Sequence, residues 1–215
     1  GPKLDWIKNK KFDAKLSKII LLILSIIISY LIAKNFNTQV LYSTVLISSA
    51  LYLFFISITD LRNEKLKLSQ KISHISFSIL IISIIFNSLL SEEVSVNLKK
   101  GEEKKLSNYL LKFENISKME INNYTSLKAE IHVIQNDNKL KFYPELRLYK
   151  VPETITSEAD IKTNLFTDNL VVVNYLKDND YLNIRYQKKP FMLLIWLSAI
   201  MLALGGLLGL RKNVG

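Results

Sequence analysis

The sequence predicts a membrane protein: four transmembrane α-helices, with a small β-rich extracytoplasmic domain between the third and the fourth. Apolar residues gather in four blocks of helix length, and the charged residues lie between these blocks. The stretch between the third and fourth blocks instead alternates polar and apolar residues, as strands do. With 49% hydrophobic residues in this arrangement, the chain does not fit a water-soluble protein with a single core.

The four apolar blocks have the length that a bilayer requires. A hydrocarbon core of roughly 30 Å needs about 20 apolar helical residues. Spans are therefore predicted at about 19–33, 40–58, 72–90 and 191–210. A basic flank precedes the first block, as in a signal peptide, but no small-residue cleavage site follows it, so we expect this helix to be retained. Glycines near the end of the fourth block permit close helix packing.

The distribution of Lys and Arg predicts which parts face the cytoplasm. Residues 92–189 hold 16 basic and 15 acidic residues, whereas the rest of the chain holds 13 basic and only 4 acidic ones. Nearly all of those 13 lie in the flank 1–18, the loop 59–71 and the tail after the last span, which fall on one side of a four-span protein. Positive segments face the cytoplasm, so 92–189 is predicted to face outward. Topology thus explains the net charge of +10, and nucleic acid is not expected as a partner.

The outward-facing stretch 92–189 is predicted to be β-rich. Apolar residues alternate around Val96, Ile131 and Ile184, and Asn and Asp residues at 136–138 and 177–180 interrupt such runs as hairpin turns do. Ser157 and Asp160 have capping-box spacing, which predicts a short helix to about Phe166. We expect a small antiparallel sheet or partly open barrel with one helix.

The composition excludes several kinds of site. The chain has no cysteine, so it has no disulfide, no thiolate nucleophile and no Cys-ligated metal. Its two histidines exclude a His-rich metal centre. His132 alternates with Ile131 and Val133, which places it on the polar face of its strand as a surface residue, facing solvent or hydrogen-bonded.

His74 lies about one turn inside the third predicted span. Ionisable residues within membrane helices are costly and usually face a bundle interior with a partner. Two interpretations stay open on the residues alone: an interfacial histidine hydrogen-bonded near the headgroups, or an axial ligand of a haem iron, a role that neutral imidazole commonly takes.

Short motifs recur over most of the chain, and the most specific is Pro144-Glu145-x-Arg147-x-Tyr149. The other motifs are Gly1-Pro2-x-Leu4-x-Trp6, Asn123-Tyr124, Pro152, Glu158, Ile161, Asp168, Arg185, Lys189-Pro190 and Ile195-Trp196. Together they resemble the C-terminal third of CcmF, the cytochrome c-type biogenesis haem lyase family within the haem-handling proteins, in which the first motif reads L-x-P-E-x-R-x-Y.

The resemblance implies that His74 is one of two transmembrane axial ligands of a b-type haem, and hence a ligand of the haem iron. It aligns with the family's A-H-x-G, although Ser73 and Ser76 stand in place of the Ala and the Gly. The partner histidine and the tryptophan-rich haem-handling segment lie upstream in the family. We therefore expect a fragment that supplies one haem b ligand, holds no catalytic residue and is not active alone.

The resemblance also implies a reaction and partners. In the family, the haem chaperone CcmE delivers haem, which the lyase joins by thioether bonds to apocytochrome c handled by thiol chaperones, while the b haem is thought to keep the substrate iron reduced. Arg147 and Arg185 would pair with haem propionates, or else form structural ion pairs with Glu145 or Asp168.

The implied location is the bacterial inner membrane or the mitochondrial inner membrane. The partners would be membrane lipid and the remaining N-terminal part of the lyase. A second interpretation is a non-catalytic membrane scaffold that presents the β domain to cytochrome c assembly partners.

Overall fold

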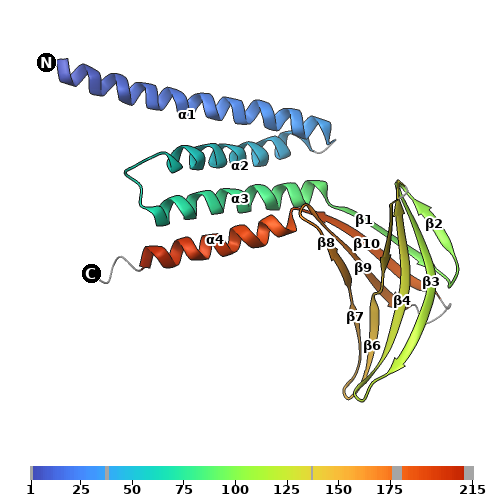
Figure 1. Ribbon diagram of the computed structural model, residues 1–215. Coiled ribbons are helices and arrows are strands. Elements are labelled where there is room, and N and C mark those ends of the chain that lie inside the picture. The colour runs from blue at the N-terminus through green and yellow to red at the C-terminus, as the bar shows by residue number, and fades with distance from the viewer. Residues whose placement is uncertain (1, 37–38, 137, 176–180, 211–215) are drawn as a thin grey trace. The chain divides into compact units, whose positions relative to one another are not determined.

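The four apolar blocks are helices in the computed structural model, which describes residues 2–36, 39–136, 138–175 and 181–210. They are α1 (Pro2–Asn35), α2 (Val40–Leu61), α3 (Leu68–Leu90) and α4 (Met192–Leu210) (Figure 1). In α1 the part Leu16–Asn35 is long and apolar enough to cross a membrane, as are the other three helices in full. The prediction of four transmembrane helices is confirmed, with α1 continuing back through the basic flank.

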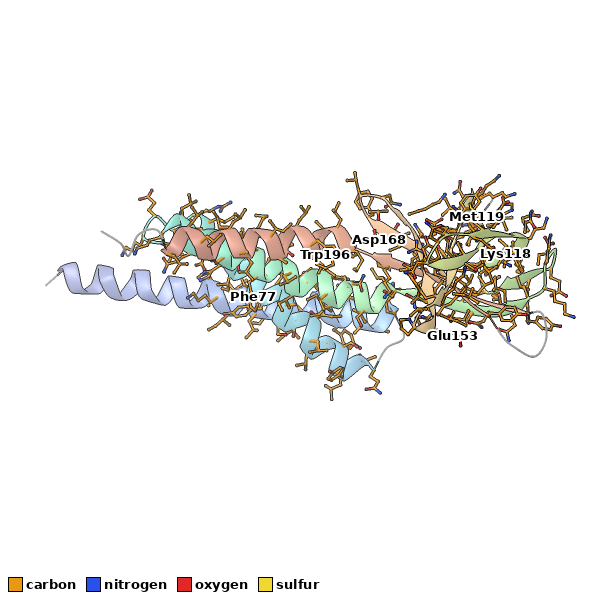
Figure 2. All side chains as sticks on the ribbon, turned by 90° about the horizontal axis from the view of Figure 1, so that it is seen from below. Phe77, Lys118, Met119, Glu153, Asp168 and Trp196 are labelled. Carbon is orange, nitrogen blue, oxygen red and sulfur yellow. The ribbon has the colours of Figure 1, made fainter. Side chains whose placement is uncertain are left out.

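The chain divides into two compact units. The helical unit comprises Gly1–Leu89 and Phe191–Gly215, and the β unit comprises Leu90–Pro190. Within the helical unit, Trp196 is 63% exposed and Phe77 is 45% exposed, and both side chains project outward from their helices (Figure 2). Large apolar residues that face outward are what a lipid or protein environment around the helices requires.

Small residues allow the first two helices to pack closely. On α1, Ser25, Ser29 and Ala33 recur every four residues and are almost fully buried. On α2, Ser43 and Ala50 are likewise buried. Residues four apart lie on one helix face, so each helix offers a narrow face on which the backbones can approach.

The serines of the helices bond to their own helix. Ser25 Oγ donates to Leu21 O at 2.7 Å and Ser76 Oγ donates to Ile72 O at 2.7 Å. This bond back to the carbonyl four residues earlier satisfies a hydroxyl that has no water to bond with. Serine-rich helices can therefore still cross the bilayer.

The β unit is a sandwich of two antiparallel sheets. One sheet has the strand order β1-β10-β9-β8, and the other has β2-β3-β4-β6-β7 with β5 also paired to β4 (Figure 1). The strands are β1 (Glu92–Leu98), β2 (Glu103–Leu106), β3 (Tyr109–Glu120), β4 (Tyr124–Gln135), β5 (Asn138–Phe142), β6 (Glu145–Lys150), β7 (Glu153–Glu158), β8 (Asp160–Thr163), β9 (Thr167–Tyr175) and β10 (Leu182–Pro190).

Alternate residues of both sheets form one core. Apolar residues from the strands around Val96, Ile131 and Ile184 are buried together, as their alternation predicts. Within this core the rings of Tyr109 and Tyr186 lie 4.9 Å apart. Burial of the phenol raises the pKa of Tyr186 to about 12, so it stays neutral and donates to Asn169 Oδ1 at 2.8 Å.

The two predicted hairpins pair as expected. β4 and β5 are antiparallel with Gln135 opposite Asn138, and Asn136 takes the left-handed conformation at φ 45° that the turn needs. β9 and β10 are also antiparallel, with Tyr175 opposite Leu182. The predicted turn at 177–180 lies outside the described residues.

Two predictions about the β unit are wrong. Residues 157–166 form no helix, because β7 continues to Glu158 and β8 begins at Asp160. The Asp160 carboxylate accepts from Tyr143 N at 2.7 Å, so it does not serve a capping box. The sequence predicts a small sheet or partly open barrel with one helix, but over the described residues the β unit is a sandwich of two sheets. The predicted helix is replaced by strands because the pairing of β8 with β9 outweighs the local capping pattern.

Candidate functional site

The turn between α2 and α3 brings the only histidine of the helices beside a carboxylate. α2 ends at Leu61, whose carbonyl accepts from Lys71 Nζ at 2.9 Å. α3 begins at Leu68, and Gln70 Oε1 accepts from Lys67 N at 3.1 Å. These bonds satisfy polar groups at the adjoining helix ends, and the last turn of α2 comes to lie against the second turn of α3.

His74 on α3 pairs with Asp60 on α2. Its Nδ1 lies 2.8 Å from Asp60 Oδ2. An ionised carboxylate only accepts hydrogen bonds, so Nδ1 carries the proton. In the neutral ring, Nε2 then bears the lone pair, which is the form that binds a metal ion.

His74 lines an open cavity. The cavity has a volume of about 370 Å³, and among the described residues no hydrogen bond to His74 Nε2 is found. Half of the His74 side chain is exposed, against a quarter of Asp60. The residues that line the cavity come from three helices: Leu53, Ile56, Ser57, Asp60, Ser73, His74, Phe77 and Leu202.

A close approach of α4 to α3 closes one side of this region. A Cβ atom added to Gly205 would lie 3.0 Å from Ser73 N and 3.2 Å from Ile72 Cγ2. At Gly206 nothing lies within 4 Å of such an atom. Of the two glycines, it is therefore Gly205 that permits the close packing beside His74.

The arrangement suits axial ligation of a haem. A helix presents an imidazole whose Nδ1 is held by a carboxylate, beside a cavity that is lined mainly by apolar side chains. Metal-bound histidines usually show this pairing, because the carboxylate fixes the tautomer and orients the ring. No group of three or more His, Cys, Asp or Glu residues that could hold a metal ion occurs within the described ranges.

The two arginines expected near haem propionates lie in the β unit, one on each sheet. Arg147 on β6 has its Nε 3.4 Å from Glu145 Oε2 and its guanidinium 5.3 Å from the centre of the Tyr124 ring. The neighbouring Tyr149 side chain raises the pKa of Arg147 above its ordinary value, and the carboxylates of Glu158 and Glu145 add to the increase. Arg147 thus pairs with Glu145, the structural partner that the sequence offered.

Arg185 on β10 lies in the other sheet and pairs weakly. Its Nη1 is 3.9 Å from Glu93 Oε1 rather than near Asp168. Since Arg147 and Arg185 sit on different sheets, the structure does not bring them together into one anion site.

His132 is buried, so the prediction of a surface histidine is wrong. It does lie on the polar face of β4, but it is only 4% exposed. Its Nε2 is 2.9 Å from Glu130 Oε1, and its Nδ1 is 3.0 Å from Glu114 Oε1, an ion-pair distance without the alignment of a hydrogen bond. A register shift between Phe113 and Asn115 makes Glu114 an extra residue in β3, and such bulges redirect a side chain.

Asp60 and Glu114 were not expected as histidine partners from the sequence. Asp60 did leave a signal, because it is the one acidic residue between Asp13 and Glu64 and it falls at the end of a span. Glu114 left none, because a bulge has no reliable local pattern. The contacts of both depend on how distant segments pair.

Comparisons with known proteins agree with the resemblance found in the sequence. Residues 89–190 match the family model described as the CcmF C-terminal beta-sandwich. The chain is 26% identical to the cytochrome c-type biogenesis protein CcmF of Escherichia coli over 229 residues, which cover all of this chain and 35% of that protein. It is 29% identical to CcmF of Pseudomonas aeruginosa over 140 residues, which cover 65% of this chain and 21% of that protein.

A solved structure shares the fold. The cytochrome c haem lyase CcmF aligns with a TM-score of 0.66 at 12% identity, covering 88% of this chain and 33% of that one. The chain thus spans between about a fifth and a third of the length of these relatives. The resemblance to the C-terminal third of CcmF is confirmed, as is the architecture of apolar helices with a β domain.

Proposed function

We propose that this chain acts in cytochrome c biogenesis as the C-terminal part of a membrane haem lyase. It supplies His74 as one axial ligand of a b-type haem, and it supplies the β sandwich as a domain on the outer side of the inner membrane of a bacterium. The similarity to CcmF proteins over the whole chain supports this role. The second ligand and the haem-handling segment would come from the N-terminal part of the lyase.

The observation that carries the proposal is the state of His74. A histidine in an apolar span is costly, and the cost is justified if the ring serves a bound group. Its Nδ1 lies 2.8 Å from Asp60 Oδ2, and the residue lines a cavity bounded mainly by apolar side chains; metal-bound histidines commonly show such a pairing with a carboxylate.

The bound haem would supply one-electron redox chemistry. The chain's own contribution would be to hold the iron through His74 Nε2, to fix the ring through Asp60, and to surround one side of the haem with Phe77, Leu53 and Leu202. The partners of the proposed lyase would be the haem chaperone CcmE and apocytochrome c with its thiol-handling chaperones.

The experiment that tests this function removes the chain from the cell that makes it. Without the chain, c-type cytochromes should lose their covalent haem stain in denaturing gels, and a copy supplied on a plasmid should restore it. Cytochromes of the b type serve as the control in absorption spectra of the membranes, because they do not need thioether attachment. Normal haem staining of the c-type cytochromes without this chain would contradict the proposal.

The proposed sidedness can be tested by protease protection. The basic residues Lys18, Arg62 and Lys71 lie near those ends of the membrane-crossing segments that the charge count assigns to the cytoplasm, while Arg211 and Lys212 lie outside the described residues. Protease added outside sealed spheroplasts should cut only within 92–189. Protection of that stretch, with cleavage at 59–71 instead, would reverse the orientation.

A further inference from the structure

We propose that Asp60 is the positioning residue of the haem ligand His74, holding the ring so that Nε2 faces the iron and strengthening its donation to the metal. The inference rests on the proposed function, since it assigns the residue that controls the same site. Asp60 touches neither iron nor substrate, and it would act through the imidazole.

The sequence makes this pairing unusual. The four segments that can cross a membrane contain one acidic residue, Asp60, and one histidine, His74. They lie on different helices, 14 positions apart, yet they meet at 2.8 Å. A carboxylate without a partner at the edge of an apolar bundle costs free energy, and a Ser or Leu side chain at position 60 would avoid that cost. The contact with His74 provides the partner that Asp60 needs.

The geometry holds the ring and the backbone of His74 from the same helix. One turn before Asp60, Ser57 Oγ lies 3.1 Å from His74 O as well as 2.8 Å from Leu53 O. Residues 57 and 60 are three apart and so lie on the same face of α2. These two contacts from one face of α2 restrict both the rotation of the His74 ring and the sliding of α3 along α2.

The chemical effect follows from the charge of the acceptor. A carboxylate that accepts the Nδ1 proton fixes the tautomer with the lone pair on Nε2, and it makes that nitrogen more basic. A more basic ligand stabilises ferric over ferrous haem iron, which lowers the midpoint potential. Without Asp60, either nitrogen could carry the proton and the ring could turn away from the cavity.

The test uses the native haem-loaded protein, purified through a tag on this chain together with whatever accompanies it. Asp60→Asn keeps the shape of the side chain but replaces the carboxylate with a neutral, weaker hydrogen-bond acceptor for His74 Nδ1. Asp60→Leu removes the acceptor, and Asp60→Glu keeps the negative charge on a longer side chain. Glu64→Gln is the matched control, because it removes an exposed carboxylate four residues further on. The readouts are the midpoint potential of the b haem and the rate of haem loss to excess apomyoglobin.

The variants should rank by the charge and reach of the acceptor. Asp60→Asn should keep a low-spin spectrum with a raised midpoint potential and lose haem roughly 10-fold faster, and Asp60→Leu should lose it roughly 100-fold faster. Asp60→Glu should return both values toward those of the parent protein, and Glu64→Gln should change neither.

The outcomes separate this inference from the proposed function. If His74→Ala loses the low-spin haem while Asp60→Asn and Asp60→Leu keep the parent midpoint potential and haem-loss rate, Asp60 is only a structural ion pair and the inference is wrong. The inference is also wrong if these two Asp60 variants lower the melting temperature without moving the midpoint potential. If His74→Ala keeps its low-spin haem, the proposed ligand itself is wrong.

Discussion

Replacing His74 with alanine is expected to abolish the low-spin b-haem spectrum of the native protein. Two strong-field axial ligands keep haem iron low-spin, and removal of one leaves a five-coordinate, high-spin iron or an empty site. Ala favours the helix at least as well as His, so α3 should still form. The measurement is the absorption spectrum of the oxidised and reduced protein purified at the parent expression level.

His132→Ala provides the matched control for this loss. It removes the other histidine of the chain, which lies in the β unit between Glu114 and Glu130. The haem spectrum should be unchanged. A normal low-spin b haem in His74→Ala would return His74 to the interfacial interpretation that the sequence left open, and loss of the haem in both variants would point to general misfolding.

Gly205→Leu is expected to destabilise the helical unit beside the haem site. Even the first atom of a side chain would lie 2.5 Å from Ser73 Oγ and 3.0 Å from the Ser73 backbone nitrogen, so α3 and α4 must separate. Overpacking of this kind costs about 1–3 kcal/mol. Since Ser73 precedes His74, haem should also dissociate faster. Thermal unfolding in detergent, followed by the haem band and by helical circular dichroism, measures both effects.

Gly206→Leu is the matched control in the same helix. A Cβ atom at Gly206 meets nothing within 4 Å, and leucine gains up to about 1 kcal/mol of helix propensity over glycine, so this variant should be as stable as the parent or more so. Equal melting temperatures for the two variants would show that α3 and α4 do not approach at Gly205.

The helices and five of the ten described strands, β1, β4, β5, β9 and β10, could be predicted from the sequence because their signals are local. An apolar block of about 20 residues specifies a membrane helix without knowledge of its neighbours. Alternation around Ile131 and Ile184 identified strands whose inward residues are the buried ones. The helix expected at 157–166 failed for the opposite reason: its two-residue capping pattern is weak, and pairing of Asp160–Thr163 with β9 decides that segment.

The candidate site was only half predictable. His74 stood out because histidine is rare in an apolar span, and the family resemblance gave it a role. Its contact with Asp60 depends on the turn that joins α2 to α3, and the burial of His132 depends on a bulge that redirects Glu114. The spacing of residues along the chain predicts neither the contact of His74 with Asp60 nor the burial of His132, because both depend on how separate segments pack.

The central claim, that the His74 imidazole binds haem iron, is tested most directly by chemical rescue. His74→Gly removes the ring and leaves space where it stood, so added imidazole can occupy the vacated position. The account predicts a high-spin or haem-depleted spectrum without imidazole and a low-spin b-haem spectrum when millimolar imidazole and haem are supplied. A low-spin spectrum in His74→Gly before any imidazole is added would contradict it.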